Sequence, residues 1–523
     1  MMLLEMAAGG FGDRVTVGPR EGGLTFQELF DRAGAAAALF RAGGASAVAM
    51  ADVSSVALPI SLFGAAWADL PFVPLNYRLT DDELASLAER VAPAVAVVNP
   101  ETAGRLSAVD GVSVLTRDAL LAEVVDAPIP APDWDMAGEG TAVLLFTSGT
   151  TGDPKAAVLR HRHLVSYVLG SVEFMGAGED EAALVSVPPY HVAGMAAILS
   201  NVYAGRRIVQ LASFDAASWV DLVRTEGVTS AMVVPTMLTL IVEYLDAEIA
   251  DGGAPEGPPL PTLRSLSYGG GKMARPTIER ALELLGDVAF VNAYGLTETS
   301  STVALLGPQD HRDALASDDE AVRARLGSVG RPLPTIEVSI HDEDGAEVAT
   351  GQPGEIWVRG EQVSGEYRGM APRLTPDGWF PTRDGGWLDD AGFLHVTGRI
   401  DDVIVKGGQN VSPGEIEAVL ISHPGVSDAA AIGLSDAQWG ERIVAAVVRT
   451  GGSTGDADQF ADELRDAVRA ELRSNRTPDH VEFMDALPYN DTGKLLRRVL
   501  RADLAHLGDD SPHEPDTVKR PVT

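Results

Sequence analysis

Thr147-Ser-Gly-Thr-Thr-Gly-Asp-Pro-Lys155 is the stretch that says most about the fold of this 523-residue chain. It follows Ala142-Val-Leu-Leu-Phe146, an apolar run that predicts a buried strand, and it precedes a second such run at 156–159. Gly149 and Gly152 let the backbone bend so that successive N–H groups face one anion, while the hydroxyls and Lys155 add donors and charge. The stretch predicts a polyphosphate-binding loop, although Ser, Thr, Gly and Pro also cluster in plain surface turns.

The spacing of this loop differs from that of the mononucleotide P-loop. The pattern G-x-x-x-x-G-K-[ST] has its lysine directly after the second glycine. Here Lys155 stands three residues after Gly152 and is followed by Ala156. We therefore expect a polyphosphate site of another kind, formed by Thr147, Ser148, Gly149, Thr150, Thr151, Gly152 and Lys155.

The composition restricts the class of partner. Lys and Arg number 40 against 75 Asp and Glu, and the net charge of −35 disfavours nucleic-acid binding because most of the surface repels polyanions. The chain has no cysteine, which excludes disulfides, thiolate metal sites and an enzyme-bound thioester. With neither a basic, apolar leader nor an apolar run of about 20 residues, the sequence predicts a cytoplasmic protein without a membrane span.

Helical and strand patterns alternate over the first part of the chain, which predicts an α/β fold with largely parallel sheets. Thr25-Phe-Gln-Glu28 has the form of a capping box that opens an amphipathic helix ending near Gly43. Asp215 is expected to be the N-cap of a helix at 218–225. Apolar runs predict strands at 48–50, 95–98, 183–187, 207–211, 231–234 and 288–291.

The pattern of apolar runs and turns changes in the last third of the chain. From about Gly327, shorter apolar runs separated by turns such as Asp344-Gly345 predict a β-rich subdomain. After Asp401 the pattern predicts a small α+β domain, with helices at 413–421 and 461–472 and strands at 426–432, 443–448 and 481–483. We expect an N-terminal domain at 1–400, its β-rich subdomain at about 327–400, a C-terminal domain at 401–507 and a disordered tail at 508–523.

Three further motifs stand far apart: Tyr294-Gly-Leu-Thr-Glu298, Arg383-Asp384 with Gly398-Arg399-Ile-Asp401-Asp402, and Asn490-Asp-Thr-Gly-Lys494. With the first loop, and in this order, they resemble the adenylate-forming superfamily of acyl-CoA synthetases, aryl-CoA ligases, peptide-synthetase adenylation domains and firefly luciferase. The resemblance runs from about Thr25 to Leu500. It implies an AMP-forming acid–thiol ligase with ATP, Mg²⁺ and coenzyme A as co-substrates and a mobile C-terminal domain.

The chemistry of acid activation explains the charged motif residues. A carboxylate must approach an anionic α-phosphate, so the charges of both must be neutralised in the transition state. By resemblance, Lys494 lies between these two anions, and Glu298, beside Thr297, binds the Mg²⁺ ion that the phosphates hold. Taken alone, Glu298 could instead cap a helix after Gly295, and Lys494 could be a solvated lysine.

The resemblance also implies a nucleotide pocket. Tyr294 would stack on adenine, Asp384 would accept hydrogen bonds from both ribose hydroxyls, and Arg399 would contact ribose or phosphate. Taken alone, Asp384 could simply begin a turn. The expected nucleotide contacts beyond the phosphate loop are Gly269, Gly270, Gly271, Asn292, Ala293, Tyr294, Gly295, Asp384 and Arg399.

The expected C-terminal domain swings in relatives between an adenylating and a thioester-forming pose. Asp401 stands at the hinge position of this movement. By resemblance, Lys406, Gly407 and Gly408 would line a tunnel for the pantetheine arm of coenzyme A. A plain turn between Ile404 and Val411 is the alternative.

The acid itself is only broadly indicated. Amino-acid-activating relatives usually have an aspartate near the position of His191, so an amino acid is disfavoured. The residues expected to line the acyl pocket are His191, Gly194, Met195, Pro235 and Met273, and their neighbourhood favours an apolar, bulky acid: medium-chain, aromatic or polycyclic. The expected acceptor is coenzyme A; the alternative is an adenylating enzyme that loads an acyl carrier protein or transfers poorly to coenzyme A.

The sequence departs from the family pattern at three places. Ala156 follows the loop lysine where many relatives have glycine, and Gly271 replaces a small side chain. Thr382-Arg383-Asp384 stands where Thr-Gly-Asp is usual. Arg383 therefore introduces a charged side chain next to the expected ribose site.

Overall fold

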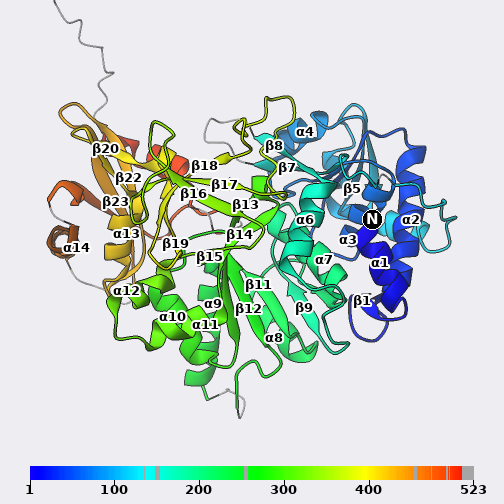
Figure 1. The fold of residues 1–523 in the computed structure, drawn as a ribbon, viewed down its shortest axis with the longest axis horizontal. Helices are drawn as coiled ribbons and strands as arrows, with labels where there is room; N and C mark the ends of the chain where they lie inside the picture. Colours follow the sequence, from blue (N-terminus) through cyan, green and yellow to red (C-terminus); the bar gives the residue numbers. More distant parts are fainter. Residues whose placement is uncertain are drawn as a thin grey trace, which may run out of the picture.

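The computed structural model describes residues 1–134, 136–147, 154–252, 257–451, 456–472, 474–490, 493 and 495–508. Figure 1 shows two large sheets with helices packed around them, and a smaller orange-to-red part on the opposite side of the view from the N-terminus. Residues 148–153 of the predicted phosphate loop, Lys494 and the predicted tail beyond residue 508 lie outside the described residues.

The larger sheet has the strand order β15-β14-β13-β12-β11-β9-β10-β1-β2. Neighbours from β13 to β1 pair in parallel, and β14, β15 and β2 add antiparallel edges. The predicted α/β architecture with largely parallel sheets is confirmed. The strands are β1 Val15–Val17, β2 Leu24–Thr25, β9 Ala182–Val185, β10 Arg207–Gln210, β11 Ser230–Val233, β12 Ser265–Gly269, β13 Ala289–Leu296, β14 Ser301–Leu306 and β15 Arg331–Pro332.

The second large sheet has the order β6-β5-β3-β4-β7-β8 and is parallel except at β8. Its last two strands form a hairpin around the predicted phosphate loop, because Thr147 and Lys155 are register partners. The strands are β3 Ala47–Ala51, β4 Phe72–Pro74, β5 Ala94–Val98, β6 Val112–Thr116, β7 Thr141–Thr147 and β8 Lys155–Arg160.

Helix starts follow the caps that the sequence predicts. Glu28 N–H donates to Thr25 Oγ1 at 3.1 Å, and Thr25 N–H donates to Glu28 Oε2 at 2.8 Å, so the capping box of α2 is confirmed. Ser218 N–H donates to Asp215 at 2.8 Å, which confirms the N-cap of α8. The first ten helices are α1 Met2–Phe11, α2 Phe26–Ala42, α3 Ala57–Trp67, α4 Asp81–Glu89, α5 Arg117–Glu123, α6 His161–Ser171, α7 Val192–Ala204, α8 Ala216–Thr225, α9 Pro235–Ala250 and α10 Arg275–Leu284.

Two smaller sheets follow in the chain. The first is antiparallel, with β16 Glu337–His341, β17 Gly354–Arg359, β18 Phe380–Leu388 and β19 Leu394–Arg399. The second comprises β20 Ile404–Lys406, β21 Gln409–Val411, β22 Val426–Asp436, β23 Gly440–Arg449 and β24 His480–Met484. The later helices are α11 Pro308–Ala316, α12 Glu320–Arg323, α13 Pro413–Ile421, α14 Ala457–Leu472 and α15 Arg497–Asp503, with short 3-10 turns η1 Pro100–Arg105, η2 Thr297–Thr299, η3 Ala324–Gly327, η4 Ile400–Asp402, η5 Ser474–Arg476 and η6 Ala505–Leu507.

Separate hydrophobic cores lie on either side of η4. The four-stranded sheet buries Ile356 and Phe380, whereas the C-terminal sheet buries Ile416 and Val447 in a cluster of its own. Burying one such side chain stabilises the fold by about 1.5–3 kcal/mol, so each part has its own source of stability. The division near residue 400 remains a prediction, which this separation of cores supports. Within the described part of the chain, no helix is long and apolar enough to cross a bilayer.

Candidate active site

Tyr294, Asp384 and Arg399 meet where β13 passes the four-stranded sheet. Asp384 lies opposite Arg399 in the antiparallel register of β18 and β19. Tyr294 donates its phenol hydrogen to Asp384 Oδ2 at 2.6 Å, and Arg399 Nε lies 2.9 Å from Asp384 Oδ1. Burial and the charge of Asp384 raise the pKa of Tyr294, so the phenol remains a donor at neutral pH. The structure thus brings together three residues that the sequence singled out.

An irregularity in β18 orients this group. Glu355 pairs with Gly385 and Trp357 pairs with Pro381, so residues 382–384 stand opposite Ile356 alone. This is a bulge, a device that redirects side chains next to functional sites. Arg383 adopts a positive φ of 65° within it, and its N–H donates to Glu355 Oε1 at 2.9 Å. As a result, Asp384 is buried, with 6 % of its surface exposed, while Arg383 forms an ion pair with Asp401.

Glu298 lies in η2, directly after β13, and is buried. The hydroxyl of Tyr367 donates to Glu298 Oε1, and burial raises the pKa of that tyrosine, which keeps it protonated. A single carboxylate fits the donor set of a Mg²⁺ ion that binds mainly through phosphates. Among the residues described, no group of three or more His, Asp or Glu side chains could hold a metal by itself. The backbone is tight here, since a Cβ on Gly295 would lie 1.8 Å from Ser301 O.

The frame of the predicted phosphate loop lies beside Glu298. Ala157, two residues after Lys155 on β8, forms an antiparallel bridge with Tyr367, whose hydroxyl binds Glu298. Residues i and i+2 of a strand lie on the same face, so Lys155 is on the same face of β8 as Ala157. At the end of the loop, Arg90 donates to Pro154 O at 2.7 Å. The structure therefore brings Lys155 and Glu298 onto neighbouring elements, as the sequence predicts for a shared site.

The glycine turn predicted to face the purine follows β12. A Cβ on Gly269 would lie 2.2 Å from Ala293 O, and Gly270 has a φ of 86°, so both positions require glycine. The C-terminal part reaches this turn. A Cβ on Gly271 would lie 3.5 Å from Gly493 O, and one on Gly493 would lie 2.8 Å from Thr236 Oγ1. Gly493 directly precedes Lys494, so the motif predicted to carry the catalytic lysine approaches the turn predicted to bind the nucleotide.

Two family models match the chain. One describes an AMP-binding enzyme and covers residues 4–368, and the other describes the AMP-binding enzyme C-terminal domain and covers residues 415–494. The chain belongs to the AMP-binding enzyme family. The resemblance to adenylate-forming enzymes that the four motifs indicate is thereby confirmed.

Relatives of this AMP-binding enzyme act on different acids. The chain is 33 % identical to a feruloyl-CoA synthase from an Amycolatopsis species over 492 residues, 92 % of this chain and 94 % of the relative. It is 32 % identical to a fatty acid–[acyl-carrier-protein] ligase from Streptomyces coeruleorubidus over 454 residues, 84 % and 83 % of the two chains. Its fold is similar to that of o-succinylbenzoate CoA synthetase from Bacillus subtilis in complex with an acyl-adenylate intermediate, with a TM-score of 0.80 and 27 % identity. The match covers 95 % of this chain and 97 % of the other.

A hydrogen-bonded network behind β12 and β13 supports the strands that carry the predicted nucleotide contacts. The hydroxyl of Tyr268 lies 2.9 Å from His311 Nε2, and His311 Nδ1 lies 2.8 Å from Gly307 O. Burial lowers the pKa of His311, so the ring is neutral, with Nδ1–H donating to the carbonyl and Nε2 accepting from the phenol. The side-chain amide of Asn292, a predicted nucleotide contact, donates to Ser328 O at 3.1 Å. That bond orients Asn292 as part of the strand's support.

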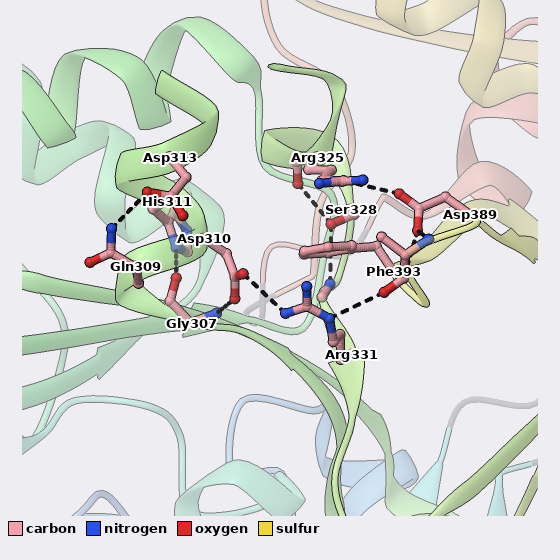
Figure 2. Close-up of polar contacts among 12 residues, drawn as sticks. Gly307, Gln309, Asp310, His311, Asp313, Arg325, Ser328, Arg331, Asp389 and Phe393 are labelled. Carbon is pink, nitrogen blue, oxygen red and sulfur yellow. Dashed lines mark hydrogen bonds and ion pairs between the residues drawn. The ribbon is translucent and has the colours of Figure 1, made fainter. Parts of the chain in front are cut away.

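The same network continues to the tip of β19, as Figure 2 shows. The ring of Phe393 lies between two guanidinium groups, with Arg325 at 4.5 Å and Arg331 at 3.9 Å from its centroid. Arg325 pairs with Asp389 at 3.0 Å and Arg331 pairs with Asp310 at 3.1 Å. These contacts join α11 and η3 to the four-stranded sheet, so the strands that carry Asn292 and Arg399 share one support.

The predicted pantetheine residues form a tight hairpin in the C-terminal part. Lys406 ends β20 and its Nζ lies 2.6 Å from Asp479 Oδ1, while Gly407 and Gly408 have φ values of 59° and 75°. The N–H of Gly407 donates to Trp439 O at 2.7 Å. The predicted strand and turn are present. A pantetheine-binding hairpin and a plain turn have this same backbone geometry, so both interpretations remain predictions.

A cleft lies at the carboxyl ends of β9, β10 and β11, the edge at which α/β folds bind ligands. Among the predicted acyl-pocket residues, His191 is the N-cap of α7 beside this cleft, and Pro235 directly precedes Thr236 in its wall. Met195 is fully buried in the large core, and a Cβ on Gly194 would lie 2.8 Å from Pro188 O. The cleft wall comprises Ser54, Tyr77, Arg78, Ser186, Val187, Pro188, Pro189, Leu211, Ala212, Ser213, Phe214, Thr236, Met237 and Leu240.

Sequence reasoning missed most of this wall, and it also missed Tyr367 as a partner of Glu298. Ser54, Ser186 and Ser213 come shortly after strand ends, so the rule for carboxyl edges of parallel strands could have singled them out. No local pattern marks Tyr367, because its relation to Glu298 depends on a bridge to β8 over a long sequence separation.

Proposed function

We propose that this AMP-binding enzyme activates an apolar carboxylic acid with ATP and transfers the acyl group to coenzyme A. In the first step a carboxylate oxygen attacks the α-phosphorus, the bond from that phosphorus to the bridging oxygen breaks, and pyrophosphate leaves. In the second, the coenzyme A sulfur attacks the acyl carbon, the thiol loses its proton, and AMP leaves. Its relatives include acid–CoA ligases, which supports both steps.

The observation that carries the proposal is the meeting of four distant motifs around one region. Asp384, Tyr294 and Arg399 form a buried hydrogen-bonded group, Glu298 lies beside the frame of the phosphate loop, and Gly493 reaches the purine turn. A nucleotide spans such a region, with its ribose near Asp384 and its phosphates near Lys155. Donors and charges fixed before the reaction lower the barrier without reorganisation.

Each motif has a proposed task in the first step. Asp384 accepts the ribose hydroxyls, which fixes the α-phosphate relative to the incoming acid. Lys155 and the loop residues hold the leaving phosphates, and Glu298 with Thr297 binds Mg²⁺, which neutralises phosphate charge when bound. Lys494 supplies the positive charge between carboxylate and α-phosphate. Ala293 and Gly295 are proposed to contact the nucleotide through their backbone atoms, because alanine has only a methyl group and glycine has no side chain.

The proposed acyl site includes Met273, which follows the purine turn, and continues toward the cleft beside His191. His191 carries no negative charge that would pair with a substrate amine, which favours acids without an α-amino group. The cleft wall combines apolar side chains such as Pro188, Phe214 and Leu240 with polar ones such as Arg78 and Ser213. In this proposal the apolar side chains exclude water from the carbon skeleton of an aromatic or medium-chain acid.

A carrier protein is the second candidate acceptor. The relative from Streptomyces coeruleorubidus is named a fatty acid–[acyl-carrier-protein] ligase. The pantetheine thiol of an acyl carrier protein is chemically the same as that of coenzyme A. The hairpin at Lys406, Gly407 and Gly408 is proposed to receive the thiol arm in both cases. A cytoplasmic location, where both acceptors occur, is part of this proposal.

Separate assays of the two steps test the proposal. Purified protein is mixed with ATP, Mg²⁺ and a panel of aromatic, medium-chain and short acids, and pyrophosphate, AMP and acyl-CoA are measured separately. Acid-dependent pyrophosphate release followed by acyl-CoA supports the ligase. Pyrophosphate release without acyl-CoA favours the carrier-protein alternative, and no release with any acid contradicts adenylation. Asp384→Ala is the control, since loss of the ribose acceptor should lower acid-dependent release at low ATP by about 10–100-fold.

A further inference from the structure

The two parts of the chain are joined by a short link at η4. The core of the four-stranded sheet ends before residue 400, and that of the C-terminal sheet begins at Ile404. Polar contacts across the boundary include Lys272 Nζ to Gly414 O at 2.9 Å, Asn410 Nδ2 to Glu343 Oε1 at 3.4 Å and the part-buried bond from Ser412 Oγ to Thr397 O at 3.2 Å. Parts that have separate cores and a polar boundary move relative to one another by default. Residues 400–402 are where the backbone must absorb such movement.

Arg383 reaches this link from the bulge in β18. Its guanidinium forms an ion pair with the carboxylate of Asp401, and the two side chains are 44 % and 31 % exposed. The next residue, Asp384, points to the other side, into the buried group with Tyr294 and Arg399. One bulge thus carries the proposed ribose acceptor on one side and a cation bound to the link on the other.

The backbone of Arg383 indicates that this arrangement has a cost. A φ of 65° is easy for glycine but unfavourable for a residue with a Cβ. Strained residues of this kind persist where surrounding contacts hold them, and they cluster at functional sites. The contacts here are the Asp401 ion pair and the bond from Arg383 N–H to Glu355 at 2.9 Å.

We propose that Arg383 is a positioning residue that latches the link at Asp401 and holds the C-terminal part in the pose seen here. This inference rests on the proposed two-step function. In this pose Gly493, next to Lys494, contacts the purine turn, so the latch favours adenylation. Rotation of the backbone at Asp401 turns the Asp401 side chain with it, and the ion pair must break before the C-terminal part can leave. Arg383 therefore slows the change from the first step to the second.

The expected size of the effect follows from exposure. Exposed ion pairs contribute little and are screened by salt, so the latch shifts the ratio of the two poses by up to about fivefold at low ionic strength. A shift of that size changes the rate of alternation without preventing it. The latch is thus a tuning device.

The absence of cysteine allows a direct test that needs no substrate. Glu343→Cys and Asn410→Cys place two thiols at a contact that exists only when the boundary is closed as here. The rate of cross-linking by a short bismaleimide then reports the population of this pose. Arg383→Ala removes the ion pair and keeps the Cβ, Arg383→Gly removes both, and Arg383→Lys keeps the charge. The matched control is Arg359→Ala, which breaks an exposed pair with Glu337 on the same sheet, away from the link.

We expect Arg383→Ala and Arg383→Gly to slow cross-linking by up to about fivefold at low salt, with the difference lost at high salt, while Arg383→Lys and Arg359→Ala stay near the parent rate. Equal rates for Arg383→Ala and the parent at low salt, or an equal loss in Arg359→Ala, would overturn the latch. Because no substrate is present, this result is independent of whether the chain forms acyl-CoA.

A second readout connects the latch to the reaction. With an acid that supports pyrophosphate release, Arg383→Ala should leave adenylation within about twofold and raise the rate of acyl-CoA formation from supplied acyl-adenylate by up to about fivefold. A general loss of stability would lower both rates together, and that outcome contradicts the proposal. If the parent protein forms no acyl-adenylate with any acid, the proposed function fails, while the cross-linking result on the latch still stands.

Discussion

Arg383 and Asp384 are adjacent in the sequence but differ in charge, in exposure and in the part of the molecule that they contact. Asp384 is buried and tied to Tyr294 and Arg399, whereas Arg383 is exposed and tied to Asp401 in the link to the C-terminal part. A buried charged group leaves costly unpaired partners when it is removed, but an exposed ion pair is weak and easily exchanged. The comparison teaches that two neighbouring residues differ in how firmly their contacts are held: those of Asp384 are buried and costly to break, and that of Arg383 is exposed and weak.

The largest expected effect concerns the C-terminal part. Lys494→Ala should lower acid-dependent pyrophosphate release by on the order of 10²–10³-fold, because one positioned positive charge is lost from the first transition state. Acyl-CoA formation from supplied acyl-adenylate should survive. Single-turnover measurement of each step checks this. An equal loss in both steps would mean that the C-terminal part does not present different groups in turn.

The second prediction breaks the fixed side. Asp384→Ala should weaken ATP binding by about 10–100-fold, the cost of removing one member of a buried charged group and leaving Arg399 without its acceptor. Calorimetric titration with ATP measures it, and a melting curve of the free protein provides the control for folding. An unchanged ATP affinity would show that this group only supports the sheet.

The third prediction restricts the link. Asp401→Pro fixes φ near −65° and should slow acyl-CoA formation by about tenfold, a barrier change of about 1.4 kcal/mol, while adenylation continues. Asp401→Ala separates the two roles of this residue, because it removes the carboxylate that binds Arg383 and leaves the backbone free. Slower transfer in both variants would place the effect in the side chain and count against a hinge at this residue.

The smallest effect belongs to the boundary. Lys272→Met removes the hydrogen bond to Gly414 O and should lower adenylation by about twofold at most because the closed pose becomes less populated. The nearby Arg275→Met, which removes an exposed pair with Glu279 on α10, is the matched control. A similar loss in both variants would attribute the change to surface charge in general.

The sequence predicted the local features well because they depend on short-range chemistry. The capping box at Thr25, the N-cap at Asp215 and the strands around the phosphate loop follow from side chains within four residues of one another. The four motifs also indicated which distant residues share a site. Asp384, Tyr294 and Arg399 meet as that resemblance implies, while the roles of these residues and of Lys494 remain predictions.

The remaining features depend on register and on long-range packing. Nothing local indicates that residues 382–384 bulge opposite Ile356, or that Arg383 in this bulge pairs with Asp401. The bond between Tyr367 and Glu298 likewise requires β8 to pass between distant segments. Met195, a predicted acyl-pocket residue on α7, is buried in the large core, and its role stays a prediction. A short stretch of sequence does not determine which distant segment it pairs with.

The cation–ring–cation sandwich around Phe393 has a consequence for how the molecule opens locally. It ties α11, η3 and the tip of β19 together, behind the strand that carries Asn292. Amide protons of β13 and β19 should therefore exchange with solvent deuterium in a single cooperative event, with matching protection, whereas those of β20 and β21 should exchange much sooner. Substituting Phe393 by leucine would split that shared event into two.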